Sequence, residues 1–237
     1  MDLQSGDKVF VKPIVGPREA IQVSLNVLII VFVCVGLSIM LDNPEQGTGL
    51  TGAGIENLKY FTVLSNVFAG IVAVLWVFFY VFSELLHIKL PVLPKIMSAS
   101  ATGLTFLVIA AFLAPMYPDL NLYAGSNLYF HLIVPLISMV EMILMKVDKK
   151  IPFRYTLISA SLALIYGIGY VINILINGIG QWPDTNDWYG FLNWGYPIGI
   201  VIFLVIILME FGIACLLRGL NILVNRICSS IMSKLFG

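Results

Sequence analysis

The chain has 237 residues, of which 59% are hydrophobic and 11% are charged, and its formal net charge at pH 7 is zero. A soluble domain carries about 25% charged residues, so this composition, with a mean hydropathy of +0.98, excludes a soluble protein and indicates one that resides in a bilayer. We expect membrane lipids and no nucleic acid as partners, while the oligomeric state stays open.

Six apolar stretches are long enough to cross a bilayer, whose hydrocarbon core requires about 20 residues of helix. They cover residues 21–41, 60–82, 96–116, 128–145, 155–176 and 196–217. The connections between them are too short to hold a separate soluble domain. We therefore predict one all-α, polytopic membrane domain, with a polar arm at 1–20, a six-helix bundle at 21–217 and an amphipathic surface helix at 218–237.

Lysine and arginine are distributed unevenly between the two sides of this six-span arrangement. Twelve of the 13 fall in the arm, the second and fourth connections and the tail, and Lys59 alone falls on the other side. The side with the excess of positive charge is the cytoplasmic one. Both termini are therefore predicted to be cytoplasmic, and the charge pattern independently supports the count of six spans.

Motifs for cofactors or metals are weak in this sequence. The first connection contains the run GTGLTG at 47–52, which matches the spacing of the dinucleotide-binding glycines. That motif requires a preceding buried strand and a following helix, so between two membrane helices we interpret it as a flexible loop. Cys34, Cys215 and Cys228 have no disulfide or metal-ligand spacing. We expect no metal and no other cofactor.

Polar residues begin the second span at helical spacing. Lys59, Thr62 and Asn66 are three and four residues apart, which places them on one face of a helix. A hydroxyl group there needs a partner, and His131, at the start of the fourth span, is the candidate. Both spans begin on the outer side, so Thr62 and His131 are expected at nearly the same depth, about 5–10 Å inside the outer boundary.

The third and fourth spans carry further signals. The third begins with a run of small residues at 98–103, which predicts a central packing helix because small side chains let backbones approach closely. In the fourth, Pro135 lacks an N–H and is expected to free the carbonyl of His131, four residues earlier. Ser138 shares the face of these two residues. Glu141 is expected to snorkel or to pair with a lysine of the fourth connection.

The fifth span carries a polar stripe at helical spacing. Its members are Tyr166, Tyr170, Asn173 and Asn177. We expect the stripe to face inward, because an unpaired amide in hydrocarbon is costly. The connection at 182–189 is aromatic and acidic, which is typical of a membrane interface. We interpret Asp184 and Asp187 as part of a solvated loop, with a calcium site as the alternative.

The chemistry that fits these residues is nucleophilic attack by a threonine, since a neutral imidazole can remove a hydroxyl proton near neutral pH. In the predicted mechanism, His131 deprotonates Thr62, the alkoxide attacks an ester carbonyl, and water activated by the same imidazole releases the acyl group. Asn66 or Lys59 is expected to stabilise the oxyanion. No buried acid completes a triad, so the residues considered for orienting the ring are Asn127, Tyr170 and Asn173. In the other interpretation, Thr62 bonds a carbonyl of its own helix and His131 is bonded to a loop.

The segment YFTVLSN at 60–66, followed by His131, Pro135 and Glu141 in the fourth span, resembles the androgen-induced family of multi-pass membrane proteins and its bacterial relatives. The resemblance implies a six-helix fold and hydrolysis of lipid esters, in particular fatty acid esters of hydroxy fatty acids. It also implies that Thr62 is the nucleophile, that His131 is the base, and that the protein lies in the plasma membrane of a bacterium. The topology matches over nearly the whole chain, whereas the specific motifs are two short segments.

Two other kinds of function stay open. In a small transporter or lipid-binding protein, His131 would titrate and would line a substrate cavity together with Tyr170, Asn173 and Asn177. In a structural or assembly protein, no enclosed cavity would exist. A cavity that opens only to the outer leaflet would favour the enzyme over the transporter.

Overall fold

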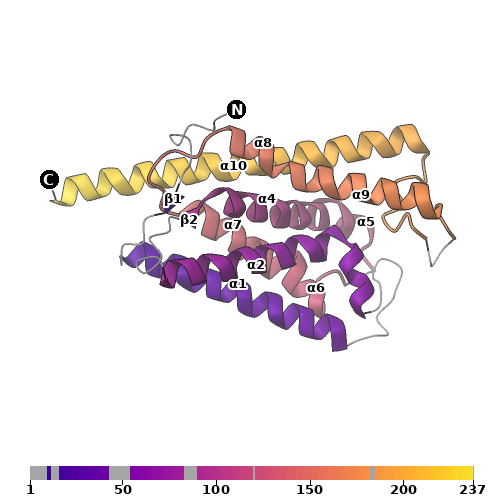
Figure 1. Cartoon of the computed structure of the whole chain (residues 1–237), viewed down its shortest axis with the longest axis horizontal. Helices are drawn as coiled ribbons and strands as arrows, with labels where there is room; N and C mark the ends of the chain where they lie inside the picture. Colours follow the sequence, from indigo (N-terminus) through magenta and orange to yellow (C-terminus); the bar gives the residue numbers. More distant parts are fainter. Residues whose placement is uncertain are drawn as a thin grey trace.

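The computed structural model describes residues 10–11, 16–42, 54–82, 90–119, 121–181 and 185–236. It has an all-α polytopic architecture, in which six helices are long and apolar enough to cross a membrane (Figure 1). These spans run Pro17–Asp42, Phe61–Val81, Leu93–Met116, Ser126–Leu144, Arg154–Asn177 and Tyr196–Ile231. The first five lie within a few residues of the predicted stretches, and the sixth is longer. The predicted fold class is therefore confirmed.

Three spans are single helices and three are composite. The single ones are α1 (Pro17–Asp42), α2 (Phe61–Val81) and α10 (Tyr196–Phe236). The composite ones are α4 (Leu93–Val108) with the π-helical turn η3 (Ile109–Leu113) and α5 (Ala114–Met116), then α6 (Ser126–Leu128) with the π-helical turn η4 (Tyr129–Ile133) and α7 (Val134–Leu144), and finally α8 (Arg154–Ser159) with α9 (Ser161–Asn177). The 3-10 helix η2 (Gly54–Lys59) precedes α2.

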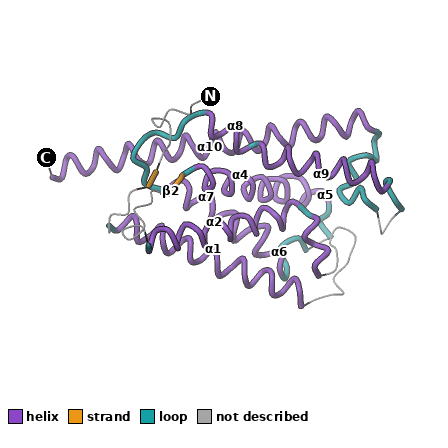
Figure 2. Tube along the Cα trace, viewed as in Figure 1, coloured by secondary structure: helices purple, strands orange, loops and turns teal. Residues whose placement is uncertain are grey.

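A short antiparallel strand pair lies at the end of the bundle where α1 begins (Figure 2). It joins β1 (Phe10–Val11) to β2 (Leu90–Pro91). The pair therefore ties the segment before the first span to the connection that leads into the third.

The third span is the central helix of the bundle. Helix α4 packs against α2, α7, α8 and α10, and every residue from Ser98 to Thr105 is buried. A Cβ atom built at Gly103 would lie 3.0 Å from both Ile213 and Met139, so glycine is what allows α10 and α7 to come this close. The small residues at 98–103 therefore act as predicted, by letting neighbouring helices approach.

Prolines account for the irregularity of two composite spans, and a carboxylate binds the start of the second helix in the third. The π-turns η3 and η4 are each followed, two residues after their ends, by a proline, at Pro115 and Pro135. Proline lacks an N–H and clashes with the preceding turn, which disturbs a regular α-helix. In the fifth span the break lies at Ala160. Glu210 of α10 accepts the N–H of Ala163 at 2.9 Å, which satisfies one N–H group that has no acceptor within the first turn of α9.

The last helix differs from the prediction of a separate surface helix after residue 217. Helix α10 is continuous over 41 residues, and its final part runs on beyond the other helices (Figure 1). Three side chains fix it against the connection between α7 and α8: Arg218 donates to the carbonyl of Ile151 at 2.7 Å, and Asn221 and Asn225 donate to that of Met145 at 2.8 and 3.0 Å. These bonds hold α10 in place at residues 218–225, and the helix continues without a break to Phe236.

Candidate active site

The first turn of α2 holds Thr62 at the edge of the bundle. Thr62 is the second residue of the helix and is half-buried. Tyr60, which precedes the helix, has an extended backbone with φ −83° and ψ 136°. Lys59 therefore belongs to η2 and does not share a helical face with Thr62. The prediction that it does is wrong. The ammonium group of Lys59 lies 5.6 Å from the ring centre of Tyr60 and 5.8 Å from that of Trp188.

The ring of His131 is oriented by a main-chain carbonyl. His131 lies in the π-turn η4, its side chain is 6% exposed, and its Nδ1 is 2.6 Å from the carbonyl oxygen of Leu122. A carbonyl oxygen can only accept a hydrogen bond, so the neutral ring carries its proton on Nδ1 and keeps the lone pair of Nε2. That arrangement is the one a general base requires. Sequence patterns do not reveal Leu122, because any residue can present a carbonyl.

Asn66 joins the segment of Thr62 to that of His131. Its Nδ2 donates to the carbonyl of Thr62 at 2.7 Å and to that of Phe130 at 2.9 Å. The start of the second span and the π-turn of the fourth are therefore in direct contact, which agrees with the equal depth predicted for Thr62 and His131. Both hydrogens of the amide are used, so the structure does not support the oxyanion role predicted for Asn66.

Two hydroxyl groups complete the layer below Thr62. Ser65 donates to the carbonyl of Thr62 at 3.0 Å and lies 3.1 Å from the hydroxyl oxygen of Thr105 on α4. The Thr62 carbonyl thus accepts from two side chains. These bonds fix the backbone of the residue without engaging its own hydroxyl group.

The polar residues of the fifth span serve the outer connection. Tyr170 donates to the carboxylate of Asp187, and Asn173 donates to Asn186 at 3.2 Å. Asn127, one turn before His131, donates through its main chain to Ala124. Within the described residues none of the three residues proposed to orient the ring, Tyr170, Asn173 and Asn127, contacts it through a hydrogen bond, and Leu122 has this role instead.

Asp187 is buried and anchors the outer connection. It is 5% exposed, and its carboxylate accepts the N–H groups of Phe191 and Leu192 at 3.0 and 2.9 Å. The prediction that it belongs to a solvated loop is therefore wrong. Asp184 lies outside the described residues. Next to this anchor, Tyr189 accepts the N–H of Phe61 at 2.8 Å, which places the connection directly on the start of α2. Burial raises the pKa of Tyr189 well above its usual value, so its phenol stays protonated.

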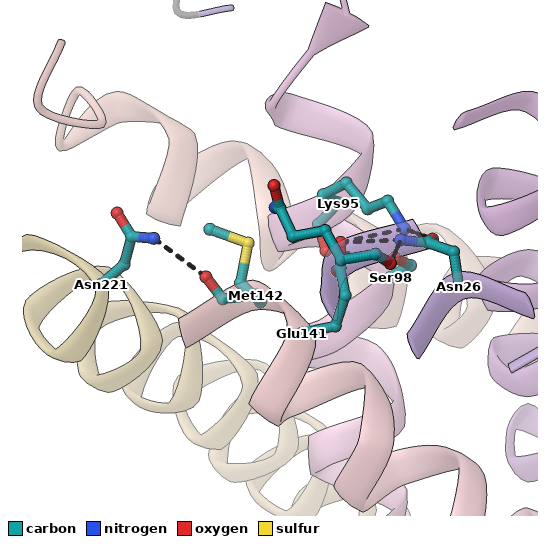
Figure 3. Close-up of polar contacts among 7 residues, drawn as sticks. Asn26, Lys95, Ser98, Glu141, Met142 and Asn221 are labelled. Carbon is teal, nitrogen blue, oxygen red and sulfur yellow. Dashed lines mark hydrogen bonds and ion pairs between the residues drawn. The ribbon is translucent and has the colours of Figure 1, made fainter. Parts of the chain in front are cut away.

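A second polar centre lies deeper in the bundle (Figure 3). Lys95 of α4 donates to the side-chain oxygen of Asn26 on α1 and lies 3.5 Å from the carboxylate of Glu141 on α7. Asn26 donates to the same carboxylate at 3.0 Å. The partner predicted for Glu141 is therefore wrong: Lys146, in the fourth connection, instead pairs with Glu19 at 2.8 Å.

This centre joins three helices. Lys95 is 3% exposed and Glu141 is 1% exposed, so both charges are removed from solvent and neutralise each other. Glu141 is ten residues after His131, which is about 15 Å along a helix. The two polar centres are therefore separate. In the second one, Lys95, Glu141 and Asn26 are partners of one another.

An apolar groove of about 260 Å³ lies between α1 and α2, but it is not part of this site. Its walls include Val67, Gly70 and Val74 of α2. None of Thr62, Asn66 and His131 is among the residues that line it. In the described part of the chain, no group of three or more metal-ligating side chains is present.

Comparisons with known proteins give no relative: no protein-family model, no curated protein and no solved structure matches the chain. The resemblance to the androgen-induced family therefore stays a prediction from the residues of the second and fourth spans. What is established is a multi-pass membrane protein with six apolar helices.

Proposed function

We propose that the protein is an intramembrane hydrolase of lipid esters, with Thr62 as the nucleophile and His131 as the base. The observation that carries the proposal is the 2.6 Å contact between Nδ1 of His131 and the Leu122 carbonyl, which leaves Nε2 unprotonated. The family resemblance supports the substrate class and the plasma membrane of a bacterium as the location.

The state of the Thr62 hydroxyl supports the same proposal. Several buried hydroxyls bond to main-chain carbonyls three or four residues earlier, as Thr102 does to Ser98 at 3.0 Å and Thr156 does to Phe153 at 2.7 Å, whereas that of Ser138 has no partner among the described residues. Among the described residues Oγ1 of Thr62 makes no hydrogen bond, either to its own helix or to His131. The alternative interpretation is therefore met in its other half only, since His131 is bonded to Leu122 in the connection before the fourth span. A hydroxyl without a fixed acceptor can give its proton to a base.

The chemistry follows in two steps. Nε2 of His131 takes the proton from Oγ1 of Thr62, and the oxygen attacks the ester carbonyl, so that the imidazolium can then protonate the leaving alcohol. Water, activated by the same nitrogen, hydrolyses the acyl-threonine and restores both groups. The main-chain N–H of Thr62 lies in the first turn of α2, where helix N–H groups lack helical acceptors, and we assign it to the developing oxyanion.

The transporter interpretation has less support from the geometry. It requires Tyr170, Asn173 and Asn177 to line a cavity with His131. Instead, Tyr170 and Asn173 bond to the outer connection, and Asn177 donates to Asn173 at 2.9 Å. The stripe is therefore engaged by the protein itself.

The proposal is tested with the purified full-length chain in lipid nanodiscs. We expect turnover of long-chain esters and covalent labelling by a fluorophosphonate probe. Removal of one catalytic group costs several orders of magnitude in triad enzymes, so Thr62→Ala and His131→Ala should each lower turnover by about 10³-fold or more. Thr102→Ala is the matched control, since it removes a buried hydroxyl outside the site, and it should retain activity. Turnover or labelling that survives both Thr62→Ala and His131→Ala contradicts the proposal.

A further inference from the structure

The π-turn before Pro135 leaves one main-chain carbonyl without a helical donor. In a π-helix each N–H bonds to the carbonyl five residues earlier, and the N–H of Val134 does bond to the carbonyl of Tyr129. The next pair in this register joins residue 135 to Phe130. Proline has no N–H, so the carbonyl of Phe130 receives no bond from its own helix.

Asn66 supplies the missing donor. Its Nδ2 lies 2.9 Å from the Phe130 carbonyl oxygen, and both residues are 0% exposed. A buried carbonyl without a donor is costly in a membrane protein. In a regular α-helix the freed carbonyl is that of His131, four residues before the proline. The π-turn moves the free position to five residues before it, and this is where Asn66 bonds.

The segment at 129–133 therefore has two possible registers, and only one of them suits Asn66. In an α-helical register Pro135 would free the carbonyl of His131 and the Phe130 carbonyl would be satisfied by Val134. A change between registers alters the number of residues per turn and rotates the side chains ahead of the proline by about 100° per residue gained or lost. The direction of the His131 ring therefore depends on which register is adopted.

We infer that Asn66 is a positioning residue that holds the His131 segment in its π register and so directs the His131 ring toward the Thr62 end of α2. The second bond of the amide, to the Thr62 carbonyl at 2.7 Å, fixes the position of the π-turn relative to α2, the helix of the proposed nucleophile. Phe130 adds to this lock, since it packs so closely on α1 that a Cβ atom at Gly36 would lie 2.7 Å from its ring. The catalytic consequence rests on the proposed function, whereas the choice of register does not.

A double-mutant cycle tests the coupling between Asn66 and Pro135 without any assay of activity. Asn66→Leu removes the donor, and Pro135→Ala gives the helix an N–H of its own. Reversible unfolding in mixed micelles should show that Asn66→Leu lowers the folding equilibrium constant by about tenfold, the usual effect of an unsatisfied buried carbonyl. In the Pro135→Ala background the same substitution should cost less than about threefold. Equal losses in both backgrounds overturn the inference.

A variant that does not fold is also informative. Failure of Asn66→Leu alone, with recovery in Asn66→Leu/Pro135→Ala, is the same coupling in a stronger form. Failure in both backgrounds overturns the inference, because the second background no longer needs the donor.

The orientation of the ring is read by ¹⁵N NMR of histidine-labelled protein, with His87→Gln used to assign the signals. The parent chain should show one tautomer of His131, protonated on Nδ1. Asn66→Leu should mix the tautomers, while Ser138→Ala, the control on the same helix, should leave them unchanged. An unchanged His131 spectrum in Asn66→Leu overturns the inference. If the parent chain hydrolyses no ester, the proposed function fails, but the cycle and the spectra still decide the role of Asn66.

Discussion

Single residues in this bundle act through the hydrogen bonds that they complete for others. His131 is held by a carbonyl that no motif could indicate, and Asn66 uses both of its N–H groups on main-chain oxygens. Lys95 shows the same rule for charge, because its ammonium group is surrounded by Asn26 and Glu141 and not by water. Buried polar side chains in a membrane are tolerated when each has a partner.

The ion pair of Lys95 and Glu141 makes a prediction at this scale. Lys95→Met leaves the Glu141 carboxylate buried without a cation, which should lower the free energy of unfolding by about 3 kcal/mol or more. Adding Glu141→Gln removes the charge and keeps an acceptor for Asn26, so the double variant should recover most of the loss. Both are measured by reversible unfolding in mixed micelles.

The control for this pair is Lys149→Met, which removes an exposed lysine of the fourth connection. A surface charge contributes about 1 kcal/mol or less, so this variant should unfold close to the parent. The interpretation of Lys95 as a paired buried cation is contradicted if Lys95→Met and Lys149→Met have the same small effect.

At the scale of elements, glycine decides where helices touch. A Cβ atom at Gly36 of α1 would lie 2.7 Å from the ring of Phe130 and 3.2 Å from Cβ of Tyr129. Gly169 of α9 has no atom within 4 Å of the same built position. The first glycine therefore sets the distance between α1 and the π-turn, whereas the second faces open space.

This contrast predicts opposite effects for the same substitution. Gly36→Ala should lower the free energy of unfolding by about 1–3 kcal/mol, because overpacking displaces Phe130 and the π-turn. Gly169→Ala should be neutral or stabilising by up to about 1 kcal/mol, since alanine favours a helix more than glycine does. Thermal unfolding of both variants checks the contrast, and a loss in Gly169→Ala as large as that in Gly36→Ala would refute it.

Hydrophobic length and spacing predicted the elements well but not their irregularities. The span bounds and the central role of 98–103 follow from composition, because a bilayer fixes helix length and small side chains fix approach. The choice between registers at 129–133 does not, since the competing hydrogen bonds differ only through a partner 64 residues away in the sequence, Asn66. The burial of Lys95 does not follow from the sequence for a similar reason: it depends on Asn26 and Glu141, each on a different helix.

The whole molecule places its two polar centres toward opposite sides of the bilayer. The site of Thr62 and His131 lies where the second and fourth spans begin, and the ion pair of Lys95 lies near the ends where α4 begins and α7 ends. The basic residues Arg18, Lys146 and Arg218 lie on the same side as this ion pair. The distribution of charge predicts that side to be the cytoplasmic one.

Single cysteines introduced into a chain whose three native cysteines are replaced by serine test this orientation. Glu56→Cys, in η2 just before the second span, should react with a membrane-impermeant maleimide in intact cells. Lys149→Cys, in the fourth connection, should react only after the cells are opened. Labelling of Lys149→Cys in intact cells would reverse the assignment of the two sides, and with it the side on which Thr62 and His131 lie.

The unbroken final helix sets how far the end of α10 extends beyond the other helices (Figure 1). From Arg226, directly after Asn225, the last residue anchored on the fourth connection, to Phe236 the helix continues for 11 residues, a length of about 16 Å. A fluorescent protein or affinity tag fused there would lie at the end of the bundle opposite to Thr62. Tags for imaging and purification therefore have an attachment point far from the candidate site of Thr62 and His131.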